Sequence, residues 1–355
     1  MSKFARSLRG TARSARDAIK SLTRRALATI TFAVCPDRAL LTADNSPPPQ
    51  FITRCVEHGH AVDDLSYVSV NDGSVVTDYG VVYDARHRLV AELCINLGGE
   101  SVKLHPLATS LSRLPPRQTR RGTAVVASSH AHQRYFHWLI DVVPKLQFLA
   151  ENPVEHDFLI VNDRLPYQIE TNDKLVDRKK LIAPDVDFHC SFDRAIGFRK
   201  TYAFGQPFLH RIGFLRELFD DRSNPARGRK LYITRADAKT RAVENEHELV
   251  EALEKIGFES VQLDGLTIKQ QADLFAPADV VVGPHGAGFA NIIFAKGKIR
   301  VLELFPQHYD SAGFSILSAL MGYDYGRMRF DSADSATHNF RVDVQGVLAC
   351  LNERA

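Results

Sequence analysis

From residue 228 onward, short apolar runs alternate with longer segments in which apolar residues recur three and four positions apart. Such short runs are typical of buried strands, and the wider spacing is typical of helices that cover a sheet. The expected strands are 230–234, 260–263, 279–283 and 300–305, and the expected helices are 244–256, 268–275, 287–294 and 311–321. Strands and helices that alternate in this way predict a parallel sheet with helices on both faces.

The pattern before residue 228 is less regular. Expected strands lie at 65–70, 80–83, 88–93, 123–127, 158–161, 186–190 and 201–204, with a hairpin turn at 84–87. One helix is expected at 135–149, and Pro144 should kink it because proline lacks a backbone N–H. The whole pattern predicts an α/β protein.

Two polar, proline-containing stretches divide the chain. The first is Asn-Ser-Pro-Pro-Pro at 45–49, and the second is 220–229, which contains Pro225 and Gly228. We therefore expect a tail at 1–45, an N-terminal domain at 46–220 and a C-terminal domain at 221–355. A chain of 355 residues is long enough for two such domains.

The net charge of +3 is unevenly distributed. Residues 1–25 contain eight Lys and Arg against one acid, Asp17, so the rest of the chain carries a small negative charge. Nucleic acid is therefore not an expected partner of the folded body.

The basic tail has two possible functions. Apolar residues at 4, 8, 12, 15, 19, 22 and 26 share one face of a helix, with basic residues on the other faces. Such a helix can lie on an anionic membrane surface, which residues 1–26 would then contact. The alternative is a solvated leader, and both interpretations stay open.

The expected location is cytoplasmic, at the inner face of the membrane if the tail binds there. No run reaches the roughly 20 apolar residues that span a bilayer, and no cleavage site for a signal peptide is evident. Five widely spaced cysteines lack the paired spacing of a disulfide framework or a zinc site, which fits a reducing compartment.

The strongest candidate site is the sequence VVVGPHGAGFAN at 280–291. An apolar strand enters a glycine-rich turn and then a helix, so free N–H groups at the helix start could bind phosphate. The candidate donor-binding residues are His285, Gly286, Ala287, Gly288 and Asn291. Glycines alone could simply make a tight turn, but a polar side chain such as His285 at this strand end should face the ligand crevice.

Two further groups should lie at the same crevice. Arg235 and Arg241 follow the strand at 230–234 and could neutralise a diphosphate, unless they belong to a solvated loop. Glu303 lies in an otherwise apolar strand, where a carboxylate needs hydrogen-bonding partners. Ribose hydroxyls would supply them, and a salt bridge within the protein is the alternative.

His137 and Asp141 form the candidate catalytic pair. They are four residues apart on the expected helix, so they share one face, and the carboxylate could orient the imidazole as a general base. Trp138, the single tryptophan, could line a sugar site or belong to the core. His130, His132 and His137 have no second carboxylate nearby, so we expect no metal site.

These motifs together resemble glycosyltransferase family 61. The resemblance covers about residues 120–305 and rests on the sequence YFHWLID at 135–141, YITR at 232–235, Asn245-Glu246, Gln271 with Phe275 and Ala278, HGAG at 285–288, and Glu303-Leu304. Residues 132–134, His-Gln-Arg, are bulkier than the resemblance leads us to expect, which bears on the acceptor side.

The resemblance implies a GT-B fold, in which two Rossmann-like domains face a cleft. It also implies inverting transfer from a sugar nucleotide to a glycan or other hydroxyl acceptor, without an essential metal or other cofactor, in surface polysaccharide (capsule or lipopolysaccharide) biosynthesis. His137, or alternatively Asp141, would take the acceptor proton. Two other functions remain as alternatives: a non-catalytic nucleotide- or glycan-binding protein that retains the fold, and a sugar-nucleotide hydrolase.

Overall fold

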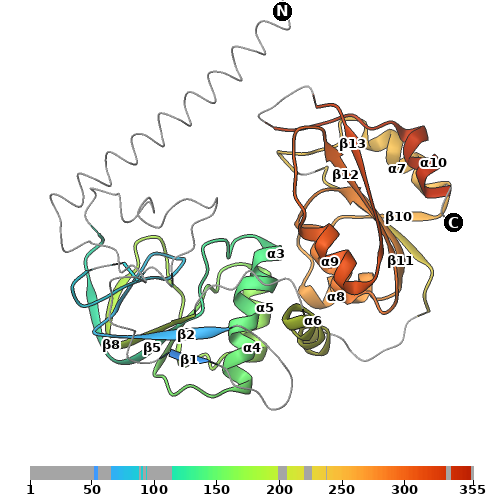
Figure 1. The fold of residues 1–355 in the computed structure, drawn as a ribbon. Coiled ribbons are helices and arrows are strands. Elements are labelled where there is room, and N and C mark those ends of the chain that lie inside the picture. The colour runs from blue at the N-terminus through green and yellow to red at the C-terminus, as the bar shows by residue number, and fades with distance from the viewer. Residues whose placement is uncertain are drawn as a thin grey trace, which may run out of the picture.

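The computed structural model describes residues 52–54, 65–87, 89–90, 93, 114–198, 206–219, 226–236, 238–332 and 337–352. They form a mixed α/β fold with two sheets, one on each side of Figure 1. The predictions for the tail at 1–45 and for the strand at 201–204 lie outside the described residues.

The second sheet is parallel throughout, as the alternating pattern predicted. Its strands are β9 (Arg229–Ile233), β10 (Phe258–Val261), β11 (Ala278–Pro284), β12 (Arg300–Pro306) and β13 (Asp324–Phe330). Its helices are α7 (Glu246–Glu254), α8 (Ile268–Phe275), η5 (Ala287–Phe294), α9 (Gly313–Met321) and α10 (Val344–Asn352). Along β12 the buried side chains alternate between two hydrophobic clusters, so both faces of the sheet are covered.

The strand order of this sheet, β10-β9-β11-β12-β13, determines where a ligand can bind. From β9 the chain first adds β10 on one side of the sheet. It then crosses to the other side of β9, where β11, β12 and β13 follow one another. Ligands bind beyond the carboxyl ends of the strands where the order reverses, which here is the edge of β9 and β11. Gly283 lets these strands approach, because a Cβ atom there would lie 2.8 Å from the Ile233 carbonyl oxygen.

The first sheet is mixed, which differs from a fully parallel Rossmann-like sheet. Its strands run in the order β1-β2-β8-β5-β6-β7, and β3 pairs with β8 and β4. The parallel part comprises β5 (Gln118–Val126), β6 (Phe158–Ile160), β7 (Leu181–Ile182) and β8 (His189–Phe198). The antiparallel part comprises β1 (Ile52–Arg54), β2 (Ser66–Asn71), β3 (Ser74–Val76) and β4 (Val81–Tyr83). β2 and β3 follow one another along β8, and the short link from β3 to β4 allows an antiparallel neighbour only.

The expected helix at 135–149 exists, with an irregular middle. It consists of α3 (Tyr135–His137), the π-helical turn η4 (Trp138–Val142) and α4 (Val143–Glu151). Pro144 lies in the first turn of α4, where its missing N–H costs little. Single π-helical turns inside α-helices are frequent at functional sites.

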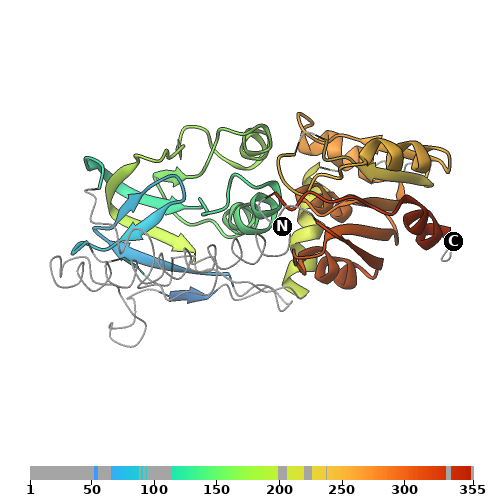
Figure 2. The ribbon, with the colours of Figure 1, turned by 90° about the horizontal axis from the view of Figure 1, so that it is seen from above.

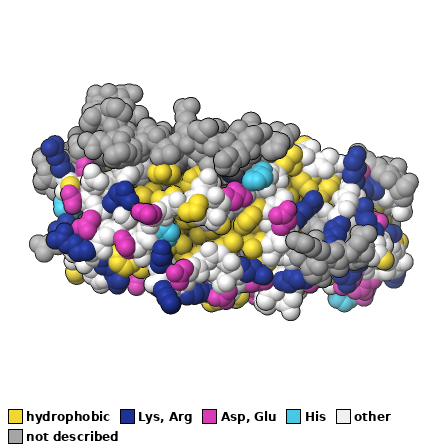
Figure 3. Space-filling view, turned by 90° about the horizontal axis from the view of Figure 1, so that it is seen from below, with side chains coloured by type: hydrophobic (Ala, Val, Ile, Leu, Met, Phe, Trp, Pro, Cys, Tyr) yellow, Lys and Arg dark blue, Asp and Glu magenta, His cyan; other side chains and the backbone are white. Residues whose placement is uncertain are grey.

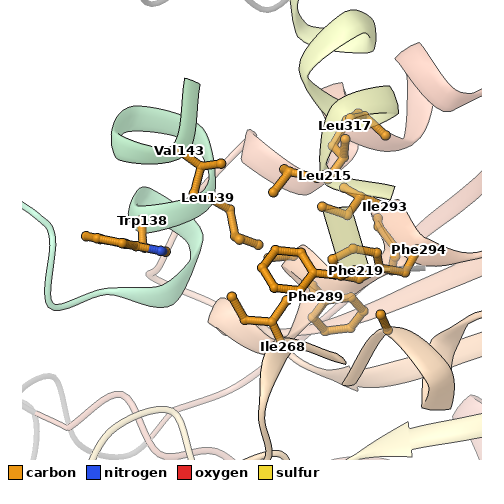
Figure 4. Packing of buried hydrophobic residues seen from close by; sticks show 14 of the residues in the cluster. Trp138, Leu139, Val143, Leu215, Phe219, Ile268, Phe289, Ile293, Phe294 and Leu317 are labelled. Carbon is orange, nitrogen blue, oxygen red and sulfur yellow. The ribbon is translucent and has the colours of Figure 1, made fainter. Parts of the chain in front are cut away.

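One of the hydrophobic clusters spans both halves of the chain. The helix α6 (Gln206–Phe219) precedes the predicted boundary at 220–229, yet it packs against α8 and η5 of the second half. Figure 4 shows Leu139 pointing from the first half toward the apolar side chains of the second, including Phe289. Figure 2 shows the two halves side by side, and the face in Figure 3 carries hydrophobic side chains in its middle, between more charged ends.

None of the helices in the described ranges combines the length and the hydropathy that a bilayer-spanning segment needs.

Candidate functional site

A pocket of about 370 Å³ lies at the carboxyl edge of the parallel sheet. The residues after β9, β10 and β11 form most of its wall, and Tyr135 and Leu165–Tyr167 of the first half close the other side. The pocket therefore occupies the edge of β9 and β11 where the strand order reverses. Its volume is within the range of small-molecule sites.

The predicted glycine-rich turn forms one wall of this pocket. Gly286, Ala287 and Gly288 line it, and the helix expected at 287–294 is the 3₁₀-helix η5. Within the described part of the chain, the N–H groups of these three residues have no hydrogen-bond acceptor. Consecutive free N–H groups of this kind bind anions.

Arg235 and Arg241 both contact the turn, Arg235 at Gly286 and Arg241 at His285. Arg235 lines the pocket, and its guanidinium packs so closely on Gly286 that a Cβ atom there would collide with it. Arg241 donates from Nε to the His285 carbonyl oxygen over 3.2 Å and stacks on the Tyr309 ring at 4.6 Å. Both cations therefore flank the predicted phosphate-binding turn, although only Arg235 faces the 370 Å³ pocket.

The backbone of Arg241 has a φ of +57°, in the left-handed region that non-glycine residues rarely adopt. A residue held in this conformation costs about 1–3 kcal/mol, and such residues cluster at ligand-binding sites. The hydrogen bond from the Arg241 N–H to the Thr337 carbonyl oxygen, 2.9 Å long, helps to hold it there.

His285 points away from the 370 Å³ pocket and toward β12. Its Nδ1 lies 2.7 Å from Glu303 Oε1, and the other carboxylate oxygen accepts a 2.7 Å hydrogen bond from the Tyr325 hydroxyl. The Glu303 side chain is 0% exposed. Both oxygens of Glu303 thus have partners within the protein. This arrangement favours a role for Glu303 in holding His285 over the predicted contact with a ribose.

Asn291 is fully buried and connects the turn to the first half of the chain. Its Nδ2 donates to Gln271 Oε1 over 2.7 Å and to the Gly288 carbonyl oxygen over 3.0 Å. Its Oδ1 accepts a 2.8 Å hydrogen bond from the Tyr135 hydroxyl. Asn291 therefore supports the turn and does not line the pocket.

The sequence patterns missed Tyr135 and Gln271 as pocket residues, along with Gln262 and Asp264 after β10. Burial raises the pKa of Tyr135 far above its usual value, so this hydroxyl remains a donor. The loop after β10 could have been found from the strand pattern, because it lies at the same edge of the sheet as the other loops.

His137 and Asp141 form the predicted pair, with His137 Nδ1 2.9 Å from Asp141 Oδ2. The two side chains are 23% and 10% exposed. His137 does not line the 370 Å³ pocket. It lies instead beside Phe136, whose ring is 5.0 Å from Phe314, and Phe314 is 5.5 Å from the His285 ring. Both histidines thus border one aromatic cluster, formed by Phe136 and Phe314, and neither histidine lines the pocket that Arg235 faces.

Trp138 belongs to the core. It is 0% exposed, and its indole N–H donates to Thr171 Oγ1 over 3.1 Å, so it does not line a sugar site in this structure.

The histidines at 130, 132 and 137 do not converge on one point. His132 Nε2 lies 3.2 Å from Asp78, and burial lowers the pKa of this imidazole. Among the residues that the structure describes, no three His, Cys, Asp or Glu side chains form a group that could hold a metal ion.

The fold and the site define an α/β protein in which a turn with free N–H groups borders a pocket at the point where the strand order reverses. The family model for glycosyltransferase 61 matches residues 135–302, which include the His137–Asp141 pair, both arginines and the turn. This region therefore belongs to glycosyltransferase family 61, as the motifs indicated, and the family supports a glycosyltransferase activity. A search of curated proteins found no match.

Proposed function

We propose that the protein is an inverting glycosyltransferase that moves a sugar from a sugar nucleotide to a hydroxyl of a glycan or a similar acceptor. One observation carries the proposal: free N–H groups and Arg235 line a pocket of about 370 Å³ at the edge of β9 and β11, inside the family match.

The geometry supports one orientation of the donor. The nucleoside would occupy the 370 Å³ pocket, and the diphosphate would lie over Gly286–Gly288 between Arg235 and Arg241. The sugar would then extend toward the aromatic cluster of Phe136 and Phe314, and His137 lies beside this cluster. This orientation places the base candidate near the anomeric carbon.

In this proposal, His137 removes the proton of the acceptor hydroxyl, whose oxygen attacks the anomeric carbon from the side opposite the diphosphate. Asp141 orients the imidazole and stabilises the imidazolium that forms. The bond from the anomeric carbon to the phosphate oxygen breaks, and the departing nucleoside diphosphate carries the new negative charge. The turn N–H groups and the two arginines would stabilise that charge.

The arginines and N–H groups can do this without a metal, so we propose metal-independent transfer. We also propose the GT-B arrangement, with an acceptor-side domain at 46–220 and a donor domain at 221–355. A role in surface polysaccharide biosynthesis, a cytoplasmic location and membrane binding through residues 1–26 are further parts of the proposal, supported by the family and by the basic tail.

Two alternatives predict different products. A non-catalytic binding protein has no need of the oriented His137–Asp141 pair and would leave the donor intact. A hydrolase would use the same pair to activate water, and would release free sugar when acceptors are present.

The donor site is tested by Arg235→Ala. Loss of a charge-assisted phosphate contact should weaken binding of nucleoside diphosphates about tenfold or more, as measured by calorimetry against a panel of them. Arg229→Ala is the matched control, because Arg229 lies at the opposite end of β9 and pairs with Glu259 at 2.8 Å. Equal affinity in Arg235→Ala and wild type, with the control also unchanged, would remove Arg235 from the site.

A further inference from the structure

The imidazole of His285 is fixed in one orientation. Its ring packs against Phe305 at 4.7 Å, Tyr309 at 5.4 Å and Phe314 at 5.5 Å, and its Nδ1 faces Glu303. Within the described part of the chain, the His285 ring makes its hydrogen bond at Nδ1, and Nε2 has no partner. Nε2 is therefore the nitrogen that remains for a ligand.

The surroundings of Glu303 keep it an acceptor at both oxygens. Burial raises the pKa of Tyr325, and the charge of Glu303 raises it further. This hydroxyl therefore keeps its proton and donates to Oε2. Arg327 Nε donates in turn to the Tyr325 oxygen over 3.2 Å, and Arg327 is paired with Asp310 at 2.7 Å. With Oε2 occupied by a donor, Oε1 must accept from Nδ1–H of His285.

A carboxylate that is 0% exposed is costly unless it is hydrogen-bonded and paired with a positive charge. His285 is the group in direct contact that can supply this charge. Arg241 is bonded to the His285 carbonyl oxygen and stacked on Tyr309, and Arg327 and Arg329 lie over the Phe305 ring at 4.4 and 5.7 Å. These cations oppose a positive charge on His285 in the free protein. An anion bound at the turn would offset this repulsion.

We infer that Glu303 is a positioning residue: it holds His285 with Nδ1–H inward, so that Nε2–H donates to a phosphate oxygen of a bound diphosphate. The inference rests on the proposed function, because it makes His285 a contact of the leaving group. An imidazole that donates from both nitrogens, to Glu303 and to the diphosphate, carries both N–H protons in the complex.

The test uses ¹⁵N-histidine NMR of the full chain with inorganic pyrophosphate as the probe. His285→Gln identifies the His285 signals among those of 14 histidines. In the free wild type at alkaline pH we expect the Nδ1–H tautomer, and near neutral pH pyrophosphate should convert His285 to the doubly protonated form. Glu303→Gln keeps the shape and an acceptor for Nδ1–H but removes the charge, so pyrophosphate should protonate His285 less and bind about tenfold more weakly.

Tyr325→Phe is the matched variant, because it removes one hydrogen bond to Glu303 and keeps the charge. Tyr325→Phe should also reduce the pyrophosphate-induced protonation of His285 and weaken pyrophosphate binding, but less than Glu303→Gln does. An Nε2–H tautomer in the free wild type, or equal pyrophosphate-induced protonation in wild type and a folded Glu303→Gln, would overturn the inference. Neither result depends on turnover, so a failure of the transferase proposal remains distinguishable.

Discussion

His137 and His285 border the same aromatic cluster, and each is held by its own carboxylate. Asp141 lies one helical turn from His137 and is 10% exposed, whereas Glu303 reaches His285 from a neighbouring strand and is fully buried. The more exposed pair is suited to exchange a proton with an acceptor. The buried pair is suited to hold a donor in a fixed orientation.

This difference predicts distinct effects of two substitutions. His137→Ala should lower turnover by about two to four powers of ten while donor affinity stays near normal, because only the general base is lost. His285→Ala should weaken donor binding as well as turnover. Measurements of turnover, donor affinity and melting temperature on both variants test this prediction. A folded His137→Ala protein with near-wild-type turnover would exclude His137 as the general base and leave Asp141 as the candidate.

At the residue scale, the sequence could predict pairs that lie within one element but not those that form between elements. The spacing of His137 and Asp141 was sufficient to predict that they form a pair, since residues four apart on a helix are neighbours. The partner of Glu303 was not predictable in this way, because Tyr325 lies on β13, a strand absent from the predicted pattern. Its side chains are mostly half-buried, so β13 lacks a clear apolar run.

At the element scale, β9, β10, β11, β12 and α8 were predicted well because their inward faces are apolar. The helix α5 (Pro166–Leu175) was missed because its buried face is polar, with Gln168, Thr171 and Asn172 inside. Gln168 and Asn172 bond to loop backbone, which no hydrophobic pattern can reveal.

The close packing of β9 against β11 gives a prediction for this element. Gly283→Ala should destabilise the protein by about 1–3 kcal/mol, because the new Cβ would collide with the Ile233 carbonyl oxygen. Gly213→Ala is the control, since Gly213 lies in α6 with open space around its Cβ position, and alanine there should be neutral or stabilising by up to about 1 kcal/mol. Urea unfolding measures both, and equal stability of Gly283→Ala and wild type would contradict the packing argument.

At the scale of the whole molecule, the pocket depends on how the two halves are joined. The Glu170 carboxylate of α5 accepts hydrogen bonds from the N–H groups of Ile268, at 2.5 Å, and Lys269, at 3.0 Å, at the start of α8. Tyr135 reaches Asn291 behind the turn, and Arg216 of α6 donates to the Ala295 carbonyl oxygen over 2.7 Å. These contacts span distant parts of the chain, so the sequence pattern could predict the glycine-rich turn but not the wall of the pocket opposite it.

The most direct measurement is a transfer assay that combines a panel of sugar nucleotides with hydroxyl acceptors and separates the products by mass spectrometry. We expect one donor to yield glycosylated acceptor and nucleoside diphosphate in equal amounts. EDTA should leave the yield unchanged, and His137→Ala should abolish most of it. A donor that binds tightly but is never consumed, or that yields only free sugar when acceptors are present, would contradict the assignment as a transferase.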